Sequence, residues 1–498
     1  MFFPSLDEVK DISKNKEYKC IPIAYELFSD IATPIEVLRI LKGCSNHCYM
    51  LESVEDSQNW GRYSFLGYDP LLEFTCQDGI VKIKGSENFD QFNDDEVVIE
   101  TENPSEIIKD LVKKNKSPKL ENLPPFTGGF VGYFAYDYIK YAEPSLKLDA
   151  ENQDQFKDID VMLFDKVIAF DNFKQKIILI VNMKNDDLEN NYETACIELK
   201  QMANLIKCGK KAKIESLKLH SDFKPVFSKK KYCDMVLKAK NYIKEGDIFQ
   251  VVLSNRIEAE ISGSLFDTYR VLRTTNPSPY MFYFSSNDIE IAGASPETLV
   301  KLTDNKLFTF PLAGTRPRGK TPEEDLKLEE ELLSDEKELA EHNMLVDLGR
   351  NDIGRISEIG SVNVEKYLSI ERFSHVMHIG STVSGTLRSD LDSLVAIDSI
   401  LPAGTLSGAP KLRACEIINE LEDNKRGIYG GAIGYVDLSG NIDTCISIRI
   451  AFARNNKVFI RSGAGIVADS VPENEFDECL NKAAAVINAL KIADGGIE

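Results

Sequence analysis

Tight polar turns separate short apolar runs in this chain of 498 residues. Ser439-Gly440-Asn441 and Asn455-Asn456 join strand-like runs at 432–436, 445–452 and 458–461. Turns this short join antiparallel neighbours, because parallel strands need a crossover of a dozen or more residues. Other strands are expected at 161–170, 176–182, 248–253, 281–284, 299–302, 307–312 and 375–384. The sequence therefore predicts sheets built largely from antiparallel strands.

Helical signals accompany these strands. Thr321-Pro322-Glu323-Glu324 forms a capping box with proline at the first helical position, which predicts the start of a helix. Further helices are expected at 104–115, 186–207, 232–244, 336–348, 412–421 and 474–492. Runs of strands followed by runs of helices predict an α+β fold with large antiparallel sheets.

Residues 205–231 are basic, contain proline and lack clear periodicity. These properties are typical of a segment that connects compact parts of a chain. We therefore expect two domains, an N-terminal one at 1–225 and a C-terminal one at 226–498.

The charge balance excludes several classes of partner. The chain has 80 Asp and Glu against 59 Lys and Arg, a formal net charge of −21, which repels nucleic acid and anionic membranes. No apolar run approaches the roughly 18 residues of a membrane helix. The N-terminus does not resemble a signal peptide. The ten cysteines are scattered along the chain and do not resemble a disulfide framework. We expect a cytoplasmic protein that binds neither nucleic acid nor membrane. An anionic substrate would need a local metal ion, arginine or cluster of backbone N–H groups.

Residues 314–321 match the G-x-x-x-x-G-K-T pattern of a nucleotide phosphate loop. Such a loop aims successive backbone N–H groups at phosphate oxygens, but Pro317 has no N–H. The helix that follows also begins with the acidic residues Glu323, Glu324 and Asp325. We interpret the segment as a different anion-handling loop, with a surface loop and a nucleotide loop as alternatives.

Arg449 and a glycine-rich segment are candidate ligand contacts. The run 445–452 alternates in polarity, which predicts that Arg449 projects from the middle of a strand, away from its apolar face. It then forms either a buried ion pair or a bidentate contact to a carboxylate or phosphate. Gly463-Ala464-Gly465 would let a ligand approach the backbone, although most such segments are turns. The run 44–48, with two cysteines and a histidine, has no second ligand pair for zinc, so packing is its default interpretation.

Acidic and histidine side chains supply further candidates. Glu341 and Glu478 lie on separate expected helices, as solvated acids or as magnesium ligands. His378 shares its strand face with small and polar residues and is the candidate for proton transfer, whereas His375 shares a face with apolar residues and is expected to pack. The Gly/Ser/Thr loop 404–411 precedes an expected helix and could cradle a carboxylate.

Together these motifs resemble the chorismate-utilising enzymes, and among them the large subunits (component I) of anthranilate synthase. The resemblance covers about residues 20–490 and is densest after 228. Its motifs are Ser295-Pro296-Glu297, 311–319, 341–352, Val376-Met377-His378, 404–411, Tyr429-Gly430-Gly431-Ala432, Arg449 and Gly463-Ala464-Gly465. The resemblance implies large antiparallel sheets packed together with helices on the outside.

The resemblance also implies a role for each site residue. Ammonia adds to C2 of chorismate as the C4 hydroxyl leaves, and pyruvate is then eliminated to give anthranilate in the first step of tryptophan biosynthesis. Glu297 is the implied general acid, His378 the base that takes the C2 proton, and Thr405 a further catalytic residue that helps to hold the substrate's carboxylates. Chorismate is implied to contact Gly314, Thr315, Tyr429, Arg449, Gly463, Ala464 and Gly465, and Mg²⁺ to bind Glu341 and Glu478.

Two positions separate this chain from related enzymes of the resembled family. Isochorismate and salicylate synthases carry a lysine base where this chain has Gln250, and aminodeoxychorismate synthases typically carry a lysine in place of Ala313. Neither residue here can act as a base or a nucleophile, which fits direct attack by ammonia.

The resemblance further implies a partner and an inhibitor. No cysteine of the chain lies in a thiol elbow suited to glutamine hydrolysis. A separate glutamine amidotransferase subunit (component II) is therefore expected to supply ammonia, in a heterotetramer of two large and two small subunits. Feedback inhibition by L-tryptophan is implied at Ser53, Pro279, Tyr280 and Met281.

Alternative functions remain open from the sequence. An aminodeoxychorismate or isochorismate synthase would differ in product, and a phosphate-loop nucleotide hydrolase would depend on residues 314–321. A non-catalytic amino-acid sensor would keep only the tryptophan site. The complete set of Glu297, Glu341, His378, Arg449 and Glu478 argues against a sensor.

Overall fold

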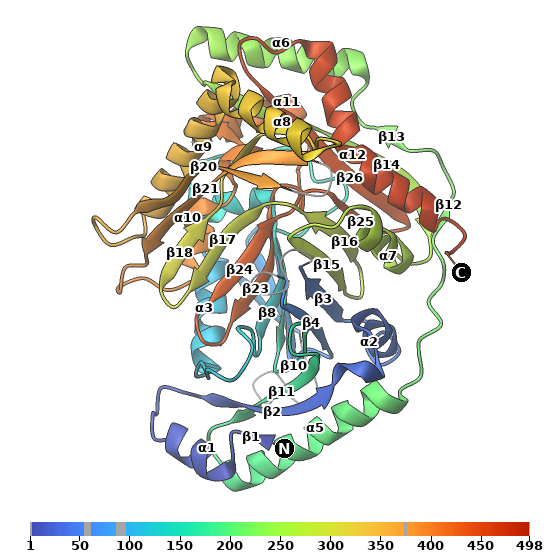
Figure 1. Ribbon diagram of the computed structural model, residues 1–498, viewed down its shortest axis with the longest axis vertical. Helices are drawn as coiled ribbons and strands as arrows, with labels where there is room; N and C mark the ends of the chain where they lie inside the picture. The colour runs from blue at the N-terminus through green and yellow to red at the C-terminus, as the bar shows by residue number, and fades with distance from the viewer. Residues whose placement is uncertain (1, 54–60, 86–95, 373–375, 498) are drawn as a thin grey trace.

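A computed structural model describes residues 2–53, 61–85, 96–372 and 376–497. The chain forms two large sheets (Figure 1) whose strand pairs all run antiparallel within these ranges. The expected α+β fold with large antiparallel sheets is confirmed.

The first sheet follows the order β1 (Phe2–Phe3), β2 (Cys20–Phe28), β11 (Lys176–Lys184), β10 (Lys166–Asp171), β4 (Tyr63–Tyr68), β3 (Cys48–Glu52), β15 (Tyr280–Ser285), β16 (Glu290–Ser295), β25 (Ile450–Arg454), β26 (Lys457–Ile466), β14 (Gln250–Ser262) and β12 (Lys218–Leu219), with β13 (Lys224–Pro225) and β22 (Gly408–Ala409) also on β14. The second follows the order β19 (Leu312–Pro317), β21 (Val376–Thr386), β18 (Lys306–Thr309), β17 (Thr298–Thr303), β24 (Ile442–Ile446), β23 (Ala432–Asp437), β8 (Gly129–Phe134), β9 (Ile159–Phe164), β5 (Leu72–Gln77), β6 (Ile80–Gly85) and β7 (Val97–Glu100), with β20 (Asn363–Arg372) on β21.

The helices are α1 (Leu6–Ile12), α2 (Pro34–Leu41), α3 (Pro104–Lys114), α4 (Ile139–Ala142), α5 (Leu188–Cys208), α6 (Lys229–Glu245), α7 (Phe266–Thr275), α8 (Pro322–Ser334), α9 (Glu336–Gly354), α10 (Val395–Ile400), α11 (Lys411–Glu422) and α12 (Pro472–Ala493), with short 3₁₀ turns at Ser29–Ile31, Tyr136–Tyr138 and Gly404–Leu406. The expected helices therefore all form, and Thr321 caps α8 by accepting from the Glu324 N–H. Within the described ranges, no helix combines the length and hydropathy that a bilayer crossing requires.

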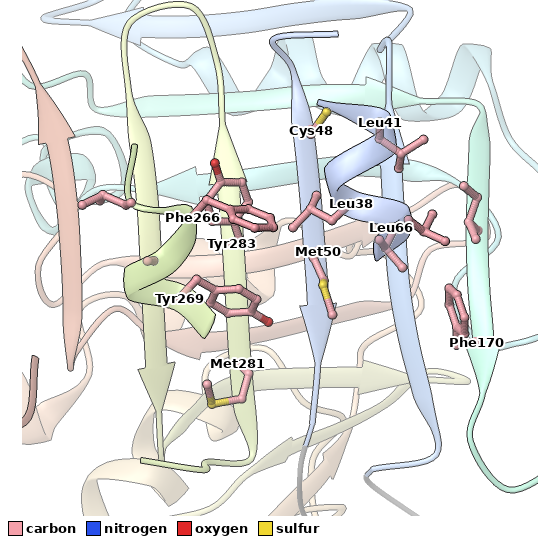
Figure 2. Close-up of a cluster of buried hydrophobic side chains, with 14 of the residues drawn as sticks. Leu38, Leu41, Cys48, Met50, Leu66, Phe170, Phe266, Tyr269, Met281 and Tyr283 are labelled. Atoms are coloured by element: carbon pink, nitrogen blue, oxygen red, sulfur yellow. The ribbon is translucent and has the colours of Figure 1, made fainter. Parts of the chain in front are cut away.

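Apolar side chains fill the space between the sheets and beneath the helices. Tyr49 and Phe282 from the first sheet share one buried cluster with Val131 and Ile433 from the second. A separate cluster lies on the other face of the first sheet, where α2 and α7 cover β3, β4 and β15 (Figure 2). Burial of this kind stabilises a fold by roughly 25 cal/mol per Å² of apolar surface, so the sheets form a rigid frame for the loops at their ends.

Both sheets combine strands from the two sides of residue 225. In the first sheet β3 pairs with β15, and in the second β8 pairs with β23. Residues 209–228 run between α5 and α6 with only the short strands β12 and β13, and those strands also pair with β14. The hydrogen bonds of both sheets therefore cross the boundary that the sequence suggested.

Three expected strands are interrupted in the structure. The run 445–452 was predicted as one strand with Arg449 in its middle, which is wrong: β24 belongs to the second sheet, β25 to the first, and Arg449 lies in the crossing between them with φ of +54°. The run 161–170 likewise divides into β9, which belongs to the second sheet, and β10, which belongs to the first. The run 307–312 breaks at Pro311, which has no N–H for a ladder.

Candidate active site

A cavity of about 920 Å³ lies where strands β14, β26, β19 and β21 meet helices α9 and α12. Every predicted catalytic and metal-binding residue lines it, as does every predicted substrate contact except Ala464. These residues are Glu297, Gly314, Thr315, Glu341, His378, Thr405, Tyr429, Arg449, Gly463, Gly465 and Glu478. Ala464 is fully buried and packs in an apolar cluster on the other side of β26, because successive residues of a strand face opposite ways.

Glu297 provides a proton donor. It lies in the two-residue link where the chain crosses from β16 in the first sheet to β17 in the second. Burial raises the pKa of its carboxyl from 4.5 to about 7, although a hydrogen bond from Thr405 and the charge of Lys482 both oppose this shift. The Thr405 hydroxyl donates to Glu297 Oε1 over 2.9 Å. A carboxyl with a pKa near 7 still carries its proton in a large fraction of molecules at neutral pH and can act as a general acid.

His378 provides a proton acceptor. Its strand, β21, pairs with β19, and there His378 faces Thr315. The Gly314 carbonyl lies 2.9 Å from His378 Nδ1, and the Thr315 hydroxyl lies 3.1 Å from the same nitrogen. Burial lowers the pKa of the imidazole, so the ring is neutral near pH 7. An Nδ1–H that donates to Gly314 leaves the basic lone pair on Nε2. His375, which was expected to pack, lies outside the described residues.

Arg449 provides a positive charge for an anionic ligand. Its guanidinium makes no hydrogen bond or ion pair with any residue in the described part of the chain, and burial lowers its pKa. Tyr429 lies close enough that its charge state affects the pKa of Arg449. A desolvated guanidinium without a partner is costly, and a bidentate carboxylate would offset that cost.

Glycine is required where the walls of the cavity approach each other. A Cβ at Gly463 would lie 2.7 Å from the Leu253 carbonyl oxygen and 3.1 Å from the Tyr429 hydroxyl. Gly314 has φ of +67°, a conformation that other residues rarely adopt. These two positions expose backbone to a ligand that a side chain would exclude.

Glu341 on α9 and Glu478 on α12 face the same cavity. Burial raises the pKa of Glu341, and the neighbouring carboxylates of Glu338 and Glu478 raise it further. Lys482, one turn after Glu478, lies 2.8 Å from that carboxylate and 3.3 Å from the Gly463 carbonyl oxygen. Carboxylates that repel one another in a shared cavity suit Mg²⁺, which binds through one or two carboxylates together with water and substrate oxygens.

A second group of carboxylates lies elsewhere. Oxygen atoms of Glu73, Asp160 and Asp288 lie within 4.8 Å of one another. Lys157 already supplies a cation there, with its Nζ 2.9 Å from Asp160 and 3.0 Å from Asp288. A metal ion would have to displace this ammonium, so the group at the large cavity is the better candidate.

The segment 314–321 does not form a phosphate loop. Its first half belongs to strand β19, and the backbone N–H groups of Gly319 and Lys320 donate to the carboxylates of Asp325 and Glu324, each over 2.8 Å. Carboxylates therefore occupy the donors that a nucleotide phosphate would need. This arrangement argues against the nucleotide hydrolase and favours the anion-handling role of Gly314 and Thr315.

The predicted tryptophan residues lie together at one end of β3 and β15. Met281 pairs with Glu52, so Ser53 continues β3 beside Pro279 and Tyr280. The Tyr280 hydroxyl donates to Asp443 over 2.8 Å and accepts from Thr298 over 3.0 Å, whereas Met281 is buried on the opposite face of the sheet. The Ser53 hydroxyl oxygen is buried and has no hydrogen-bond partner among the described residues.

Sequence reasoning missed several residues of the cavity. Lys482, Glu338 and Glu475 all line it, and Arg461 forms part of its floor. For Lys482 a signal existed, because a lysine four residues after Glu478 lies on the same face of a helix. Gln250 and Ala313, the two positions that separate the related enzymes, also line the cavity.

The fold and the cavity define an enzyme for a small anionic substrate, since a proton donor, a proton acceptor, an arginine and two acidic groups converge in one deep pocket. A family model described as "chorismate binding enzyme" matches residues 47–488. The chain is 46% identical to "Anthranilate synthase component 1" of Acetivibrio thermocellus over 99% of both chains, and 45% identical to the protein of that name from Aquifex aeolicus over 98% of both. The chain belongs to the family of chorismate-binding enzymes.

Solved structures agree with this assignment. The crystal structure of anthranilate synthase component I from Streptococcus pneumoniae superposes with a TM-score of 0.75 at 38% identity, covering 92% of this chain and 98% of that one. The menaquinone-specific isochorismate synthase of Escherichia coli superposes with a TM-score of 0.69 at 18% identity, covering 97% of this chain and 98% of that one. At that identity the second likeness concerns the fold alone.

Proposed function

We propose that this chain is the large subunit of an anthranilate synthase, which converts chorismate and ammonia into anthranilate and pyruvate in tryptophan biosynthesis. Full-length relatives at 45–46% identity support this function. The observation that carries it is the chemistry of the cavity wall, where Gln250 and Ala313 offer neither a base nor a nucleophile. The absence of a lysine at these two positions favours direct attack by a free amine over an activated water or a covalent lysine intermediate.

The chain's own residues divide the reaction into two proton transfers. Arg449 and the backbone at Gly463 and Gly465 bind the carboxylates of chorismate, with Tyr429 and Thr405 beside them. Glu297 gives its proton to the C4 hydroxyl, which leaves as water while ammonia adds to C2. His378 then takes the C2 proton, the C3–O bond breaks as the ring becomes aromatic, and the enolpyruvate that leaves takes up a proton to become pyruvate.

We propose Mg²⁺ as the cofactor, bound by Glu341 and Glu478. Bound there, the ion would supply positive charge to a substrate carboxylate. We further propose that a glutamine amidotransferase subunit supplies ammonia in a heterotetramer of two large and two small subunits. We place the enzyme in the cytoplasm, where thiols stay reduced; all ten cysteines lie in the described residues and are free.

We also propose that L-tryptophan inhibits the enzyme from a site at Ser53, Pro279, Tyr280 and Met281. The unpartnered Ser53 hydroxyl and the pairing of β3 with β15 support this placement. β15 also pairs with β16, which leads directly into Glu297. Inhibitor binding at this strand end could therefore alter the position of the general acid.

The test is anthranilate fluorescence after the protein is mixed with chorismate, Mg²⁺ and ammonium at alkaline pH. We expect anthranilate to form and to require all three components, and tryptophan to suppress it. Aminodeoxychorismate or isochorismate as the product, with no anthranilate, would refute the proposal.

A further inference from the structure

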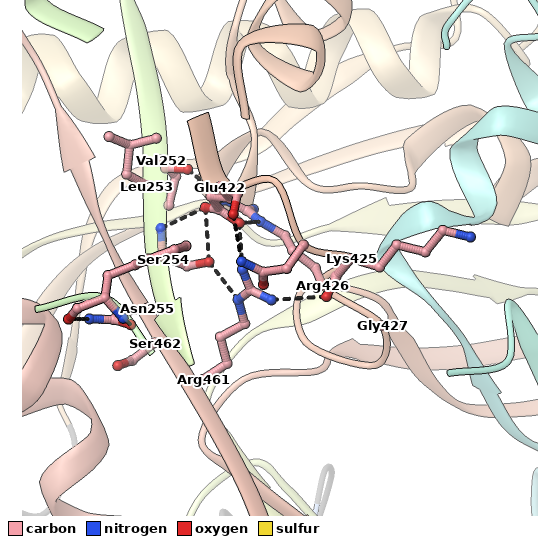
Figure 3. A network of polar contacts seen from close by, with 12 residues as sticks. Val252, Leu253, Ser254, Asn255, Glu422, Lys425, Arg426, Gly427, Arg461 and Ser462 are labelled. Atoms are coloured by element: carbon pink, nitrogen blue, oxygen red, sulfur yellow. Dashed lines mark hydrogen bonds and ion pairs between the residues drawn. The ribbon is translucent and has the colours of Figure 1, made fainter. Parts of the chain in front are cut away.

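A network of buried charged side chains adjoins the cavity: Arg461 lines the cavity, whereas Glu422 and Arg426 lie behind it. Figure 3 shows the contacts of this network. It consists of Glu422 at the end of α11, Arg426, Arg461 on β26 and Ser254 on β14, each no more than 2% exposed. Glu422 accepts hydrogen bonds from Arg426 Nη2 over 2.5 Å and from Arg461 Nη2 over 2.6 Å. The Ser254 N–H and hydroxyl also donate to Glu422, over 2.7 Å and 2.9 Å.

The two arginines also hold backbone that carries residues of the cavity. Arg426 Nη1 donates to the Leu406 carbonyl over 2.6 Å, and its guanidinium carbon lies 5.9 Å from the centre of the Tyr429 ring. Arg461 precedes Gly463 by two residues on β26, and its Nη1 donates to the Lys425 carbonyl over 3.0 Å. The network thus connects the Thr405 loop, the segment before Tyr429 and the strand of Gly463.

Stability alone does not account for such a network. Buried ion pairs are often no more stabilising than apolar residues of the same volume, because charges lose their hydration. Here two guanidinium groups share one carboxylate, so a net positive charge is buried beside the cavity. A fixed positive charge at this depth favours an anionic ligand in front of it.

We propose that Glu422, Arg426 and Arg461 form a positioning network that aligns Thr405, Tyr429 and Gly463 for chorismate. This inference rests on the proposed function and extends it to residues behind the cavity wall. These three residues act through others and are positioning residues rather than catalytic ones.

The network also reaches the general acid. Arg426 holds the Leu406 carbonyl, Leu406 follows Thr405, and Thr405 donates to Glu297. That last hydrogen bond stabilises the Glu297 carboxylate and lowers its pKa. When Arg426 releases the loop and the bond is lost, the Glu297 pKa rises, since its remaining influences are burial and the charge of Lys482. A structural role without positioning would leave this pKa unchanged.

The test compares Arg426→Lys with Arg454→Lys as a matched control. Arg454 is also mostly buried and also bonds backbone carbonyls and a carboxylate, those of Asp154, Gln155 and Asp288, but it does not line the active-site cavity. For Arg426→Lys we expect kcat/KM for chorismate to fall about 10-fold or more, with KM raised. The pH at which kcat/KM declines on the alkaline side should move upward at constant free ammonia. For Arg454→Lys both quantities should match the wild type.

Equal behaviour of the two variants, or an unchanged alkaline limb in Arg426→Lys, would overturn the proposal. If Arg426→Lys does not fold, Ser254→Ala provides the second test of the network. It removes the hydrogen bonds that the hydroxyl makes with Glu422 and Arg461 but keeps the ion pairs of both arginines with Glu422. Because Arg461 then loses a support for the strand that carries Gly463, KM for chorismate should rise, and an unchanged KM counts against the network. Wild-type protein that forms no anthranilate would instead refute the function, and chorismate affinity by calorimetry would then test the network separately.

Discussion

Replacing Glu297, the proposed general acid, should make the protein more stable while it removes most of the catalytic activity. Glu297 has a pKa of about 7 in the folded chain and an ordinary value of 4.5. The difference is about 2.5 pH units, and at about 1.4 kcal/mol per unit it corresponds to about 3 kcal/mol. Because the folded-state pKa is the higher one, the folded state binds the proton more tightly, so stability falls as pH rises from 4.5 through 7.

The variant Glu297→Gln removes this penalty. Glutamine keeps the shape of the side chain and an oxygen that can accept from Thr405, but it cannot ionise. We expect it to be more stable than the wild type by up to about 3 kcal/mol at pH 8, and no more stable at pH 4.5. The Glu297 side chain is only partly shielded from solvent, so the value is an upper limit. Thermal unfolding of both proteins at the two pH values measures the difference.

The same variant should have little anthranilate-forming activity. A control, Glu258→Gln, replaces a glutamate that does not line the cavity and should show no such gain at pH 8. If Glu297→Gln gains no stability between pH 4.5 and pH 8 relative to the wild type, Glu297 is not held protonated by burial, and its role as the acid is wrong.

Three other predictions concern the cavity and the inhibitor site. His378→Gln should accumulate the aminated intermediate, since no base takes the C2 proton. Mass spectrometry of the products measures this intermediate, and formation of anthranilate at the normal rate would contradict the prediction. Lys482→Met removes the ammonium 2.8 Å from Glu478 and should tighten Mn²⁺ binding in the absence of chorismate, measured by calorimetry; weaker binding would contradict it. Tyr280→Phe removes the hydrogen bonds with Asp443 and Thr298. It should raise the tryptophan concentration for half-inhibition about 5-fold or more. Unchanged inhibition would show that the Tyr280 hydroxyl plays no part in inhibition by tryptophan.

The sequence predicts most elements of the fold because its local signals agree with the final structure. The polar turns 439–441 and 455–456 do join antiparallel neighbours, and Thr321 caps α8 as its motif indicates. The resemblance selected residues of the cavity that no periodicity could have brought together. Glu341 and Glu478 are far apart in the chain, and only the packing of α9 and α12 beside the sheets places both at one cavity.

Two predicted site residues lie where the chain crosses between the sheets. Glu297 lies where the chain crosses from β16 to β17, and Arg449 where it crosses from β24 to β25. At such crossings the alternation of side chains is interrupted, so strand period wrongly placed Arg449 within a continuous strand. Glu422 and Arg426 stand at i,i+4 spacing, which is a local signal that the sequence analysis did not use. The contacts of Ser254 and Arg461 with Glu422 join residues far apart in the sequence and leave no local pattern.

The charges of the cavity explain how an acidic protein can bind an acidic substrate. Glu338, Glu341, Glu475 and Glu478 face the cavity at the end formed by α9 and α12, with Lys482 among them. Arg449 and Arg461 also line the cavity, and Arg461 shares the Glu422 carboxylate with the buried Arg426. A dianion is therefore attracted by the arginines and repelled by the carboxylates until these are neutralised. With Mg²⁺ bound by the carboxylates, as proposed, metal affinity and substrate affinity would be interdependent, and by thermodynamic reciprocity each ligand would strengthen the binding of the other by the same factor.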